Sequence, residues 1–400
     1  MKKSRARDVL ERDKRLSAIL DAEFPRFSGP EMARRRALMD EAMRARGVDH
    51  LVSHGAWFGR AAVTWLTQWP VTVEALLVYT PGEEGALYIQ FYNHVPLARR
   101  LTEGVVPTWG GESTIDTAIA ELKRRGARPG RVAVQGAVPF NIYGMLSAAF
   151  GNIVDMNGDY YRMRLVKSAE EMDWFRIGAA LSDLSIDALN REIRVGLTER
   201  ELCDIVEHAY IGRGGVNVIH FFGVTSMREP TMCVPAQFPS TRKVRKGDVI
   251  STEITTNFWD YGGQVLRTFS VGEPLIPPFQ ELHNAADAAY DAIFAVLRPG
   301  VHARELAAAA KVIDDRGFTI YDDLVHGGGG NYGTPVIGTP SRPNHPVPDV
   351  TLRPGMLVIV QPNVITRDGS AGIQTGECIL ITDTGAESIH TAPRGPFQVG

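Results

Sequence analysis

The feature that most constrains the fold is a long β-rich stretch in the second half of the chain. Residues 246–272, KGDVISTEITTNFWDYGGQVLRTFSVG, read as two long antiparallel strands joined near Trp259–Gly263. Helical patterns and further strands surround this pair, which indicates helices backed by a strongly bent antiparallel sheet, an α+β arrangement. We expect the helices at 168–193, 198–213, 278–296 and 299–317, and the further strands at 355–365 and 376–385.

Capping signals mark where two of these helices begin. Ser168 is followed three residues later by Glu171, and Thr198 is followed in the same way by Glu201. In such a capping box the hydroxyl accepts a hydrogen bond from the backbone of the third helical residue, whose carboxylate bonds back to the capping residue. Both pairs therefore predict the first turn of a helix.

The first half of the chain alternates short strands with helices. We expect a helix at 32–46, a hairpin at 74–90, a helix at 115–125 and a strand at 131–136. Alternation of this kind indicates an α/β domain with a mixed or parallel sheet. We place the boundary between the two domains near residues 160–166, which predicts a first domain at 1–162 and a second at 163–400.

Residues 1–30 are expected to form a helical arm. The segment 7–24 has the pattern of an amphipathic helix. Two interpretations remain open, because such an arm either packs on a partner subunit or frays as a terminal helix.

Length and composition support two globular domains and exclude some partners. The 400 residues, 44% hydrophobic and 22% charged, suffice for two ordinary cores. The net charge of -3 and the shortness of the basic clusters predict no nucleic-acid partner. No apolar run approaches the roughly 18 residues of a membrane span, so no membrane association is expected. Three widely spaced cysteines argue against a disulfide framework and predict a reducing, cytoplasmic location.

Four motifs in the second half occur in the order and spacing of a known superfamily. They are KSAEE at the start of a long helix, STRKVRKGDVIS before the long strands, LRPGMLVIVQPNV, and CILITDTGAESI near the end. Over roughly residues 32–395 the chain resembles the creatinase/aminopeptidase superfamily, which contains methionine aminopeptidase, proline aminopeptidase, prolidase and creatinase. The resemblance implies an α/β N-terminal domain plus an α+β pita-bread C-terminal domain. It also implies a homodimer in which the first domain of the neighbouring subunit caps the active site.

In that superfamily five side chains, Asp, Asp, His, Glu and Glu, normally bind two divalent metals. Their positions fall in chain order on Glu253, Gln264, His326, Gln361 and Gly376. Gly330 competes with His326 in the alignment, and Glu377 stands one residue out of register with the last position.

These exchanges remove most of the negative charge that two neighbouring cations need. A neutral amide offers a carbonyl dipole in place of a carboxylate, and about three of the four carboxylates are lost or displaced. We therefore expect no dinuclear metal site and no cofactor. A single metal held by Glu253, His326 and Glu377 is the alternative that the residues leave open.

Creatinase resembles this case, because it keeps the fold, lacks metal and cleaves a small molecule with a histidine and carboxylates. The present chain nevertheless departs from it. Gln237 stands where creatinase has an active-site histidine, and Leu266 stands where it has the glutamate that binds the guanidinium-like group. The nearest upstream imidazole belongs to His220. Creatine is therefore not the expected substrate.

The residues expected to bind substrate are Gln264, Gln361, His220, Gln237, Arg60 and Tyr261. The two amides at 264 and 361 bind polar substrate atoms in one interpretation and simply fill a vacated site in the other. His220 lines a pocket wall or is a satisfied core histidine. Arg60 lies within an aromatic cluster that either closes a small pocket or packs in the core, namely Trp57, Phe58, Trp65 and Trp69.

The leading prediction is a metal-independent, creatinase-like hydrolase that breaks a C–N bond in a small molecule. His326 moves protons in this hypothesis, while Glu253 and Glu377 orient water or a cationic group. The competing interpretations are a loop histidine bonded to a carbonyl and a carboxylate on an exposed strand face. The alternative functions are a lyase acting on a small substrate, a mononuclear Xaa-Pro-type metallopeptidase, and a non-catalytic binding protein.

Overall fold

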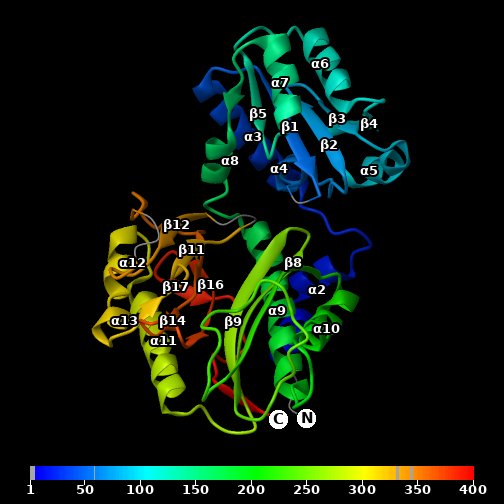
Figure 1. The fold of residues 1–400 in the computed structure, drawn as a ribbon. Helices are drawn as coiled ribbons and strands as arrows, with labels where there is room; N and C mark the ends of the chain where they lie inside the picture. Colours follow the sequence, from blue (N-terminus) through cyan, green and yellow to red (C-terminus); the bar gives the residue numbers. More distant parts are fainter. Residues whose placement is uncertain (1–4, 58, 330–332, 343–345) are drawn as a thin grey trace. The chain divides into compact units, whose positions relative to one another are not determined.

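The computed structural model describes residues 5–57, 59–329, 333–342 and 346–400. The chain divides into two compact units (Figure 1). The N-terminal unit is Ala22–Arg164, and the C-terminal unit combines the described part of 1–21 with Leu165–Gly400. The first unit is α/β and the second is α+β, as the sequence predicts.

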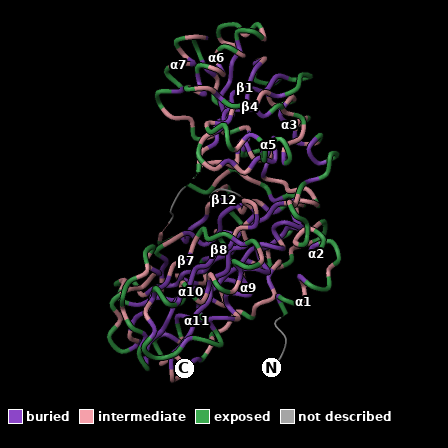
Figure 2. Tube along the Cα trace, turned by 90° about the vertical axis from the view of Figure 1, so that its right-hand side faces the viewer, coloured by how far each residue is buried: buried purple, intermediate pink, exposed green. Residues whose placement is uncertain are grey.

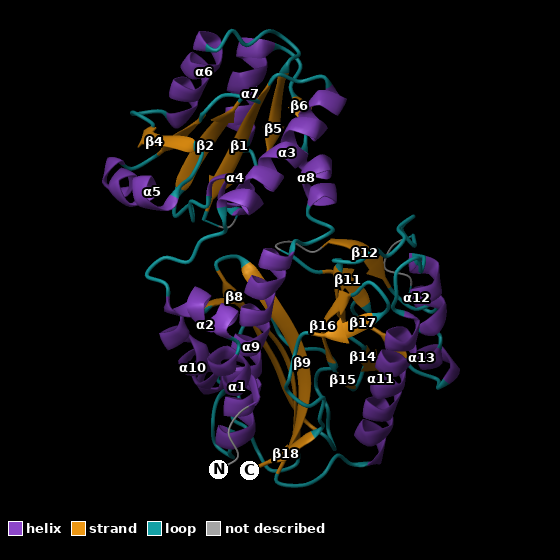
Figure 3. Ribbon diagram, turned by 180° about the vertical axis from the view of Figure 1, so that it is seen from behind, coloured by secondary structure: helices purple, strands orange, loops and turns teal. Residues whose placement is uncertain are grey.

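The N-terminal unit is built on one mixed sheet with the strand order β4-β3-β2-β1-β5-β6. Its elements are α3 (Gly29–Arg46), β1 (His50–Ala56), α4 (Ala61–Thr67), β2 (Glu74–Tyr79), β3 (Gly85–Ile89), η1 (Tyr92–His94), α5 (Val95–Leu101), β4 (Val105–Trp109), α6 (Thr114–Arg124), β5 (Val132–Gln135), α7 (Phe140–Phe150), β6 (Val154–Asp155) and α8 (Asn157–Met163). The expected hairpin is β2 with β3, and β1 pairs in parallel with β5. Helices α6 and α7 lie against this sheet (Figure 3). Their apolar side chains pack with those of β1, β2 and β5 in one core.

The C-terminal unit is built on a strongly bent, largely antiparallel sheet with the path β12-β11-β13-β16-β9-β8-β7. Its elements are α1 (Arg5–Arg12), α2 (Lys14–Asp21), α9 (Ala169–Glu192), α10 (Glu199–Tyr210), η2 (Ile211–Arg213), β7 (Val216–Ser226), β8 (Asp248–Phe258), β9 (Tyr261–Val271), α11 (Pro277–Val296), α12 (Ala303–Ala309), α13 (Val312–Asp315), β10 (Thr319–Ile320), β11 (Val325–Gly327), β12 (Gly333–Ile337), β13 (Leu357–Val360), β14 (Asn363–Ile365), β15 (Gly372–Gln374), β16 (Gly376–Ile381), β17 (Ala386–Ser388) and β18 (Phe397–Val399). A smaller sheet has the order β10-β14-β15.

Local sequence signals account for how the main elements of this unit begin and turn. Both capping boxes form, and they start α9 and α10 as predicted. The long strands β8 and β9 are joined by Trp259 and Asp260, which have positive φ angles of 49° and 72°. Positive φ at both central residues gives a turn whose twist matches that of the strands.

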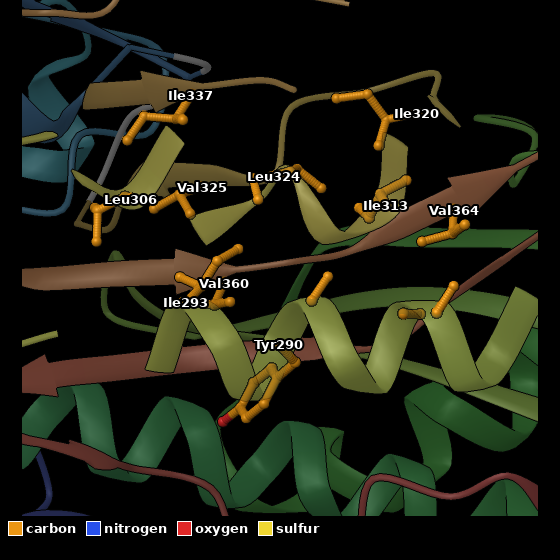
Figure 4. Packing of buried hydrophobic residues seen from close by; sticks show 14 of the residues in the cluster. Tyr290, Ile293, Leu306, Ile313, Ile320, Leu324, Val325, Ile337, Val360 and Val364 are labelled. Carbon is orange, nitrogen blue, oxygen red and sulfur yellow. The ribbon is translucent and has the colours of Figure 1, made fainter. Parts of the chain in front are cut away.

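Close packing of α9 on β9 depends on a glycine. A Cβ atom added at Gly263 would lie 2.1 Å from the Cα of Ala179, so a larger residue would push the helix away from the sheet. The long helix α11 packs on the other strands through an apolar cluster that includes Ile293, Val325 and Val360 (Figure 4). In the same view the ring of Tyr290 is directed away from these aliphatic side chains. The strands of both units are mostly buried, and exposed residues gather on helices and loops (Figure 2).

Two expected elements differ from the structure. The helix expected at 299–317 begins later, because Gly300 has a φ of +84° and His302 caps the start of α12. The strand expected at 355–365 is split into β13 and β14, which belong to different sheets. The split falls at Pro362, whose ring nitrogen cannot donate a ladder hydrogen bond.

The N-terminal arm is also different from the expected single helix. Asp13 separates α1 from α2, because its carboxylate accepts a hydrogen bond from the backbone N–H of Arg15. Both helices pack on α9 of the same chain, with Leu10 and Leu16 buried. No helix in the described ranges is long and apolar enough to cross a membrane.

A buried ion pair ties the C-terminal end of the chain to α9. Asp183 on α9 accepts a 2.7 Å hydrogen bond from His390 Nδ1 and further bonds from the backbone N–H groups of Thr391 and Ala392. Burial alone would lower the pKa of His390, but the Asp183 carboxylate outweighs it and raises that pKa to about 10. The reciprocal attraction keeps the pKa of Asp183 below its ordinary value despite burial.

We predict that Asp183→Asn destabilises the C-terminal unit by about 3–5 kcal/mol, because it leaves a buried imidazole without its counter-charge. The folded pKa of His390 is raised above its ordinary 6.5, so its stabilisation is complete below about pH 6.5 and is lost as the pH rises to about 10. Hydrogen exchange at the amides of α9 measures both effects. Asp204→Asn is the matched control, because Asp204 pairs with His208 on the exposed surface. Equal exchange rates in the two variants would contradict the prediction.

Candidate active site

Strand register places the first two predicted site residues on one face of the bent sheet. Glu253 on β8 lies opposite Leu266 on β9, two residues from Gln264. Gly376 on β16 also lies opposite Leu266. Directly opposed residues share a face, and so do residues two apart in a strand. Glu253, Gln264 and Gly376 therefore occupy the same face.

The remaining two predicted residues reach that face from β11 and from the end of β13. His326 lies opposite Ile359, which is two residues before Gln361. Ile359 on β13 also lies opposite Cys378 on β16, and Cys378 is two residues after Gly376. Register alone therefore gathers the five positions singled out in the sequence. Gly330, the competing position for His326, lies outside the described residues.

A continuous chain of hydrogen bonds joins these side chains. Nε2 of Gln264 donates to Oε1 of Glu253 at 2.9 Å and to Oε1 of Gln361 at 2.8 Å. Nε2 of Gln361 in turn donates to Oδ1 of Asp323 at 2.7 Å. All four residues are buried. Side-chain amides thus connect two buried acids that would otherwise be isolated.

Asp323 was not singled out in the sequence. It precedes β11 and is fully buried, and Asn363 holds its backbone carbonyl with a 2.7 Å hydrogen bond from Nδ2. A signal was present, because two successive acids, Asp322 and Asp323, stand directly before an apolar pair and His326. A buried acid is costly unless it is paired, so its position next to a buried strand could have marked it.

Burial moves the two titratable groups of this face in opposite directions. It raises the pKa of Glu253 to about 8, and the charges of Asp322 and Asp323 add to the effect. It lowers the pKa of His326, although hydrogen bonds with Gly327 and Gln361 oppose the change. Near neutral pH Glu253 is therefore largely protonated and His326 largely uncharged. A proton donor and a proton acceptor thus occupy one face of the sheet.

Glu377 lies on the opposite face and contacts other partners. It forms an ion pair with Arg267 and accepts a 3.0 Å hydrogen bond from the hydroxyl of Tyr290. Burial works to raise its pKa, but the Arg267 guanidinium outweighs burial and keeps that pKa below the ordinary value. Arg267 also donates to four backbone carbonyls, those of Leu266, Gly376, Ala392 and Pro393. The structure therefore does not bring Glu377 together with Glu253, and its role here is to anchor strands.

Other predicted binding residues also lie apart from this chain of side chains. His220 pairs across β8 with Ile254, so it faces away from Glu253, and the hydroxyl of Tyr210 lies 3.1 Å from its Nε2. Burial lowers the pKa of His220 to about 4. Gln237 is exposed in a loop, where it donates to the carbonyl of Pro235 at 3.5 Å.

The last two predicted binding residues have local roles in the structure. Tyr261 packs on Phe175 of α9 and donates to Glu171 at 3.3 Å. Arg60 belongs to the N-terminal unit, where its carbonyl accepts a hydrogen bond from Thr64 at the start of α4. Within the aromatic cluster around Arg60, Trp65 and Trp69 are buried and Trp57 is exposed, while Phe58 lies outside the described residues.

The side chains present do not fit the two metals that the resemblance implies. In the described part of the chain, no group of three or more His, Cys, Asp and Glu side chains could hold a metal ion. The Nε2 atoms of Gln264 and Gln361 donate to Glu253 and Asp323, so an amide N–H already occupies one oxygen of each acid. A Cβ atom at Gly376 would lie 2.3 Å from the carbonyl oxygen of Val360, so no side chain fits there without a backbone shift. The single-metal set of Glu253, His326 and Glu377 is likewise not assembled.

We predict that Glu253→Gln changes stability in a pH-dependent way, because the amide mimics the protonated acid and still accepts from Gln264. The folded pKa of Glu253 lies near 8, above its ordinary 4.5, so wild type loses stability relative to the variant as the pH rises between these values. The expected difference at the upper end is about 1–4 kcal/mol. Calorimetric melting temperatures across this range measure it. The exposed substitution Glu229→Gln is the control, and a difference independent of pH would refute the assignment.

Comparisons with known proteins agree with this fold. The model of metallopeptidase family M24 matches residues 173–383. The Xaa-Pro dipeptidase of Pyrococcus furiosus is 23% identical over 234 residues, which cover 58% of this chain and 65% of that protein. An uncharacterized peptidase of Staphylococcus aureus is 25% identical over 235 residues, covering 56% and 62% respectively. The chain thus aligns with less than two thirds of the length of these relatives.

Solved structures extend the likeness to both units. The Xaa-Pro dipeptidase from Bacillus anthracis superposes with a TM-score of 0.78 at 19% identity, covering 92% of this chain and all of that one. The X-Pro aminopeptidase from Thermotoga maritima gives a TM-score of 0.76 at 22% identity, covering 90% of this chain. These matches show the pita-bread fold. Because the family model covers more than half of the chain, the protein belongs to metallopeptidase family M24, a family of hydrolases.

Proposed function

We propose that the protein is a metal-independent hydrolase that cleaves a C–N bond in a small molecule. The observation that carries the proposal is the hydrogen-bonded chain Glu253–Gln264–Gln361–Asp323. Its first three residues fall on positions that the resemblance assigns to metal ligands. Two amides cannot neutralise paired divalent ions, and they are already committed to the acids beside them. In this proposal side chains therefore do the chemistry that metals do in metal-binding members of the superfamily.

In this proposal His326 and Glu253 divide the proton transfers. The uncharged imidazole of His326 takes a proton from water, and the resulting hydroxide attacks the carbon of an amide-like group. The C–N bond breaks, and the leaving nitrogen takes the proton of Glu253. The products are a carboxylic acid and an amine, and water then carries the extra proton of His326 to Glu253, which restores both residues. The raised pKa of Glu253 and the lowered pKa of His326 support these roles, because each group is in the required protonation state near neutral pH.

Dipeptides and small amides are the first substrates to test, because the relatives are named Xaa-Pro dipeptidases and a peptide bond is a C–N bond. The cytoplasmic location and the homodimer stay predictions of the sequence.

We predict that hydrolysis persists in excess EDTA and that the purified protein carries less than one equivalent of divalent metal per chain. The reason is that no set of three metal-binding side chains is assembled in the described residues. Elemental analysis and assays with and without chelator measure this. Two bound ions per chain, or activity that vanishes with EDTA and returns with metal, would overturn the proposal and support a metallopeptidase.

We predict that His326→Ala lowers kcat by about 10²–10⁴-fold, the usual contribution of a general base, with a much smaller change in KM. Steady-state kinetics on the best substrate of an amide and dipeptide panel measures the effect. His208→Ala is the control, because His208 is exposed on α10. Unchanged kcat in the His326 variant would remove this residue from the mechanism.

A further inference from the structure

The side-chain amides of Gln264 and Gln361 are oriented, because each has its oxygen on one side and its nitrogen on the other. The acids at the two ends, Glu253 and Asp323, differ in which orientation they allow. A carboxylate accepts hydrogen bonds, whereas a carboxamide has an accepting oxygen and a donating nitrogen. Either amide could be turned over without changing the shape of the site. Some group must therefore decide which way Gln264 and Gln361 face.

Glu253 cannot set the orientation of the two amides. A carboxyl group that carries its proton can donate from one oxygen and accept at the other, so it suits either orientation of Gln264. The carboxylate of Asp323 suits one orientation, because it needs a donor. It receives Nε2 of Gln361 at 2.7 Å. This turns Oε1 of Gln361 toward Gln264, which must then present its own Nε2.

Asp323 itself is held firmly enough to act in this way. It is fully buried at the end of the loop before β11. Its backbone carbonyl accepts from Asn363 at 2.7 Å, and the Oδ1 atom of Asn363 accepts from the backbone N–H of Tyr321 and of Asp322 at 3.0 and 2.8 Å. These bonds fix the backbone that carries the Asp323 side chain, and burial restricts the carboxylate that accepts from Gln361.

The direction decides which atoms remain for a ligand. Both hydrogens of Gln264 Nε2 are used, by Glu253 and by Gln361. Oε1 of Gln264 receives no hydrogen bond from the described residues, and neither does Oε2 of Glu253. Oε1 of Glu253 already accepts, so the protonated form that its raised pKa favours carries the proton on Oε2. One acceptor and one donor thus stand on adjacent, hydrogen-bonded side chains.

We propose that Asp323 is a positioning residue that orients both amides, so that Gln264 and Glu253 present an acceptor beside a donor and select a neutral amide group. An amide offers the complementary N–H and C=O, whereas a carboxylate offers two acceptors and would leave Gln264 Oε1 unpaired. This inference rests on the proposed function for its ligand. The orientation of the two amides can be tested without any activity.

The experiment is NMR of protein labelled with ¹⁵N in its glutamine side chains. Signals of Gln264 and Gln361 are assigned by their loss in Gln264→Glu and Gln361→Glu. In wild type both are expected as single, sharp side-chain amide pairs that exchange slowly with water. In Asp323→Asn an amide replaces the carboxylate with the same shape, so both directions become possible. The two signals are then expected to double or broaden.

Gln135 and Gln374, both buried and outside the chain of amides, provide the matched controls in each unit. Their unchanged signals show that the variant is folded. If Asp323→Ala also folds, faster exchange at Gln264 and Gln361 is expected. Single, sharp and unshifted signals of both residues in folded Asp323→Asn would overturn the positioning role, whatever the enzyme's substrate proves to be.

Titration with acetamide and acetate tests the ligand class in the same samples. Acetamide is expected to shift the Gln264 signal at a concentration about tenfold lower than the concentration of acetate that gives the same shift. The reason is that bound acetate leaves one polar atom, Gln264 Oε1, without a hydrogen bond. This preference is expected to disappear in Asp323→Asn. Equal response of wild type to the two compounds would overturn the amide selection while leaving the NMR result on Asp323 intact. Loss of hydrolysis in the presence of chelator would instead count against the proposed function.

Discussion

The site depends on how two buried acids are satisfied without a cation. Glu253 and Asp323 lie in a water-poor region where unpaired charges are costly. Two carboxamides, Gln264 and Gln361, bridge them by hydrogen bonds, and one of the acids keeps its proton. The bridge supplies hydrogen bonds but little charge, and the proposed chemistry by proton transfer rests on this property.

The opposite face of the same sheet carries charged side chains that pair with one another. Arg267 pairs with Glu377 and bonds four backbone carbonyls, and Tyr290 reaches the same carboxylate from α11. Another buried ion pair, between Asp183 and His390, joins α9 to the C-terminal segment. The two faces therefore divide the work. One carries a charged network that holds the strands, and the other carries Glu253 and the two amides that link it to Asp323.

Most of the fold could be predicted from local signals. The capping boxes at Ser168 and Thr198 and the long strand pair turning at Trp259 and Asp260 have the predicted form, because each depends on residues close in sequence. The predicted positions Glu253, Gln264, His326 and Gln361 gather on one face because strand alternation carries a local pattern into space. The arm was harder, since its docking on α9 depends on contacts far along the chain. Its break at Asp13 depends on a local bond from Arg15 that the helical pattern does not reveal.

The sequence by itself determined that Gln264, Gln361 and Gly376 carry no carboxylate, because residue type alone decides the charge available at each position. The tertiary structure decided which acids share the site. A shift of one residue in a strand reverses the face, so Glu377 joins Arg267 instead of Glu253. Asp323, distant in sequence from both glutamines, enters the site because a loop carries its side chain to Gln361. Such partnerships depend on register and on loop path, which no local pattern of residues specifies.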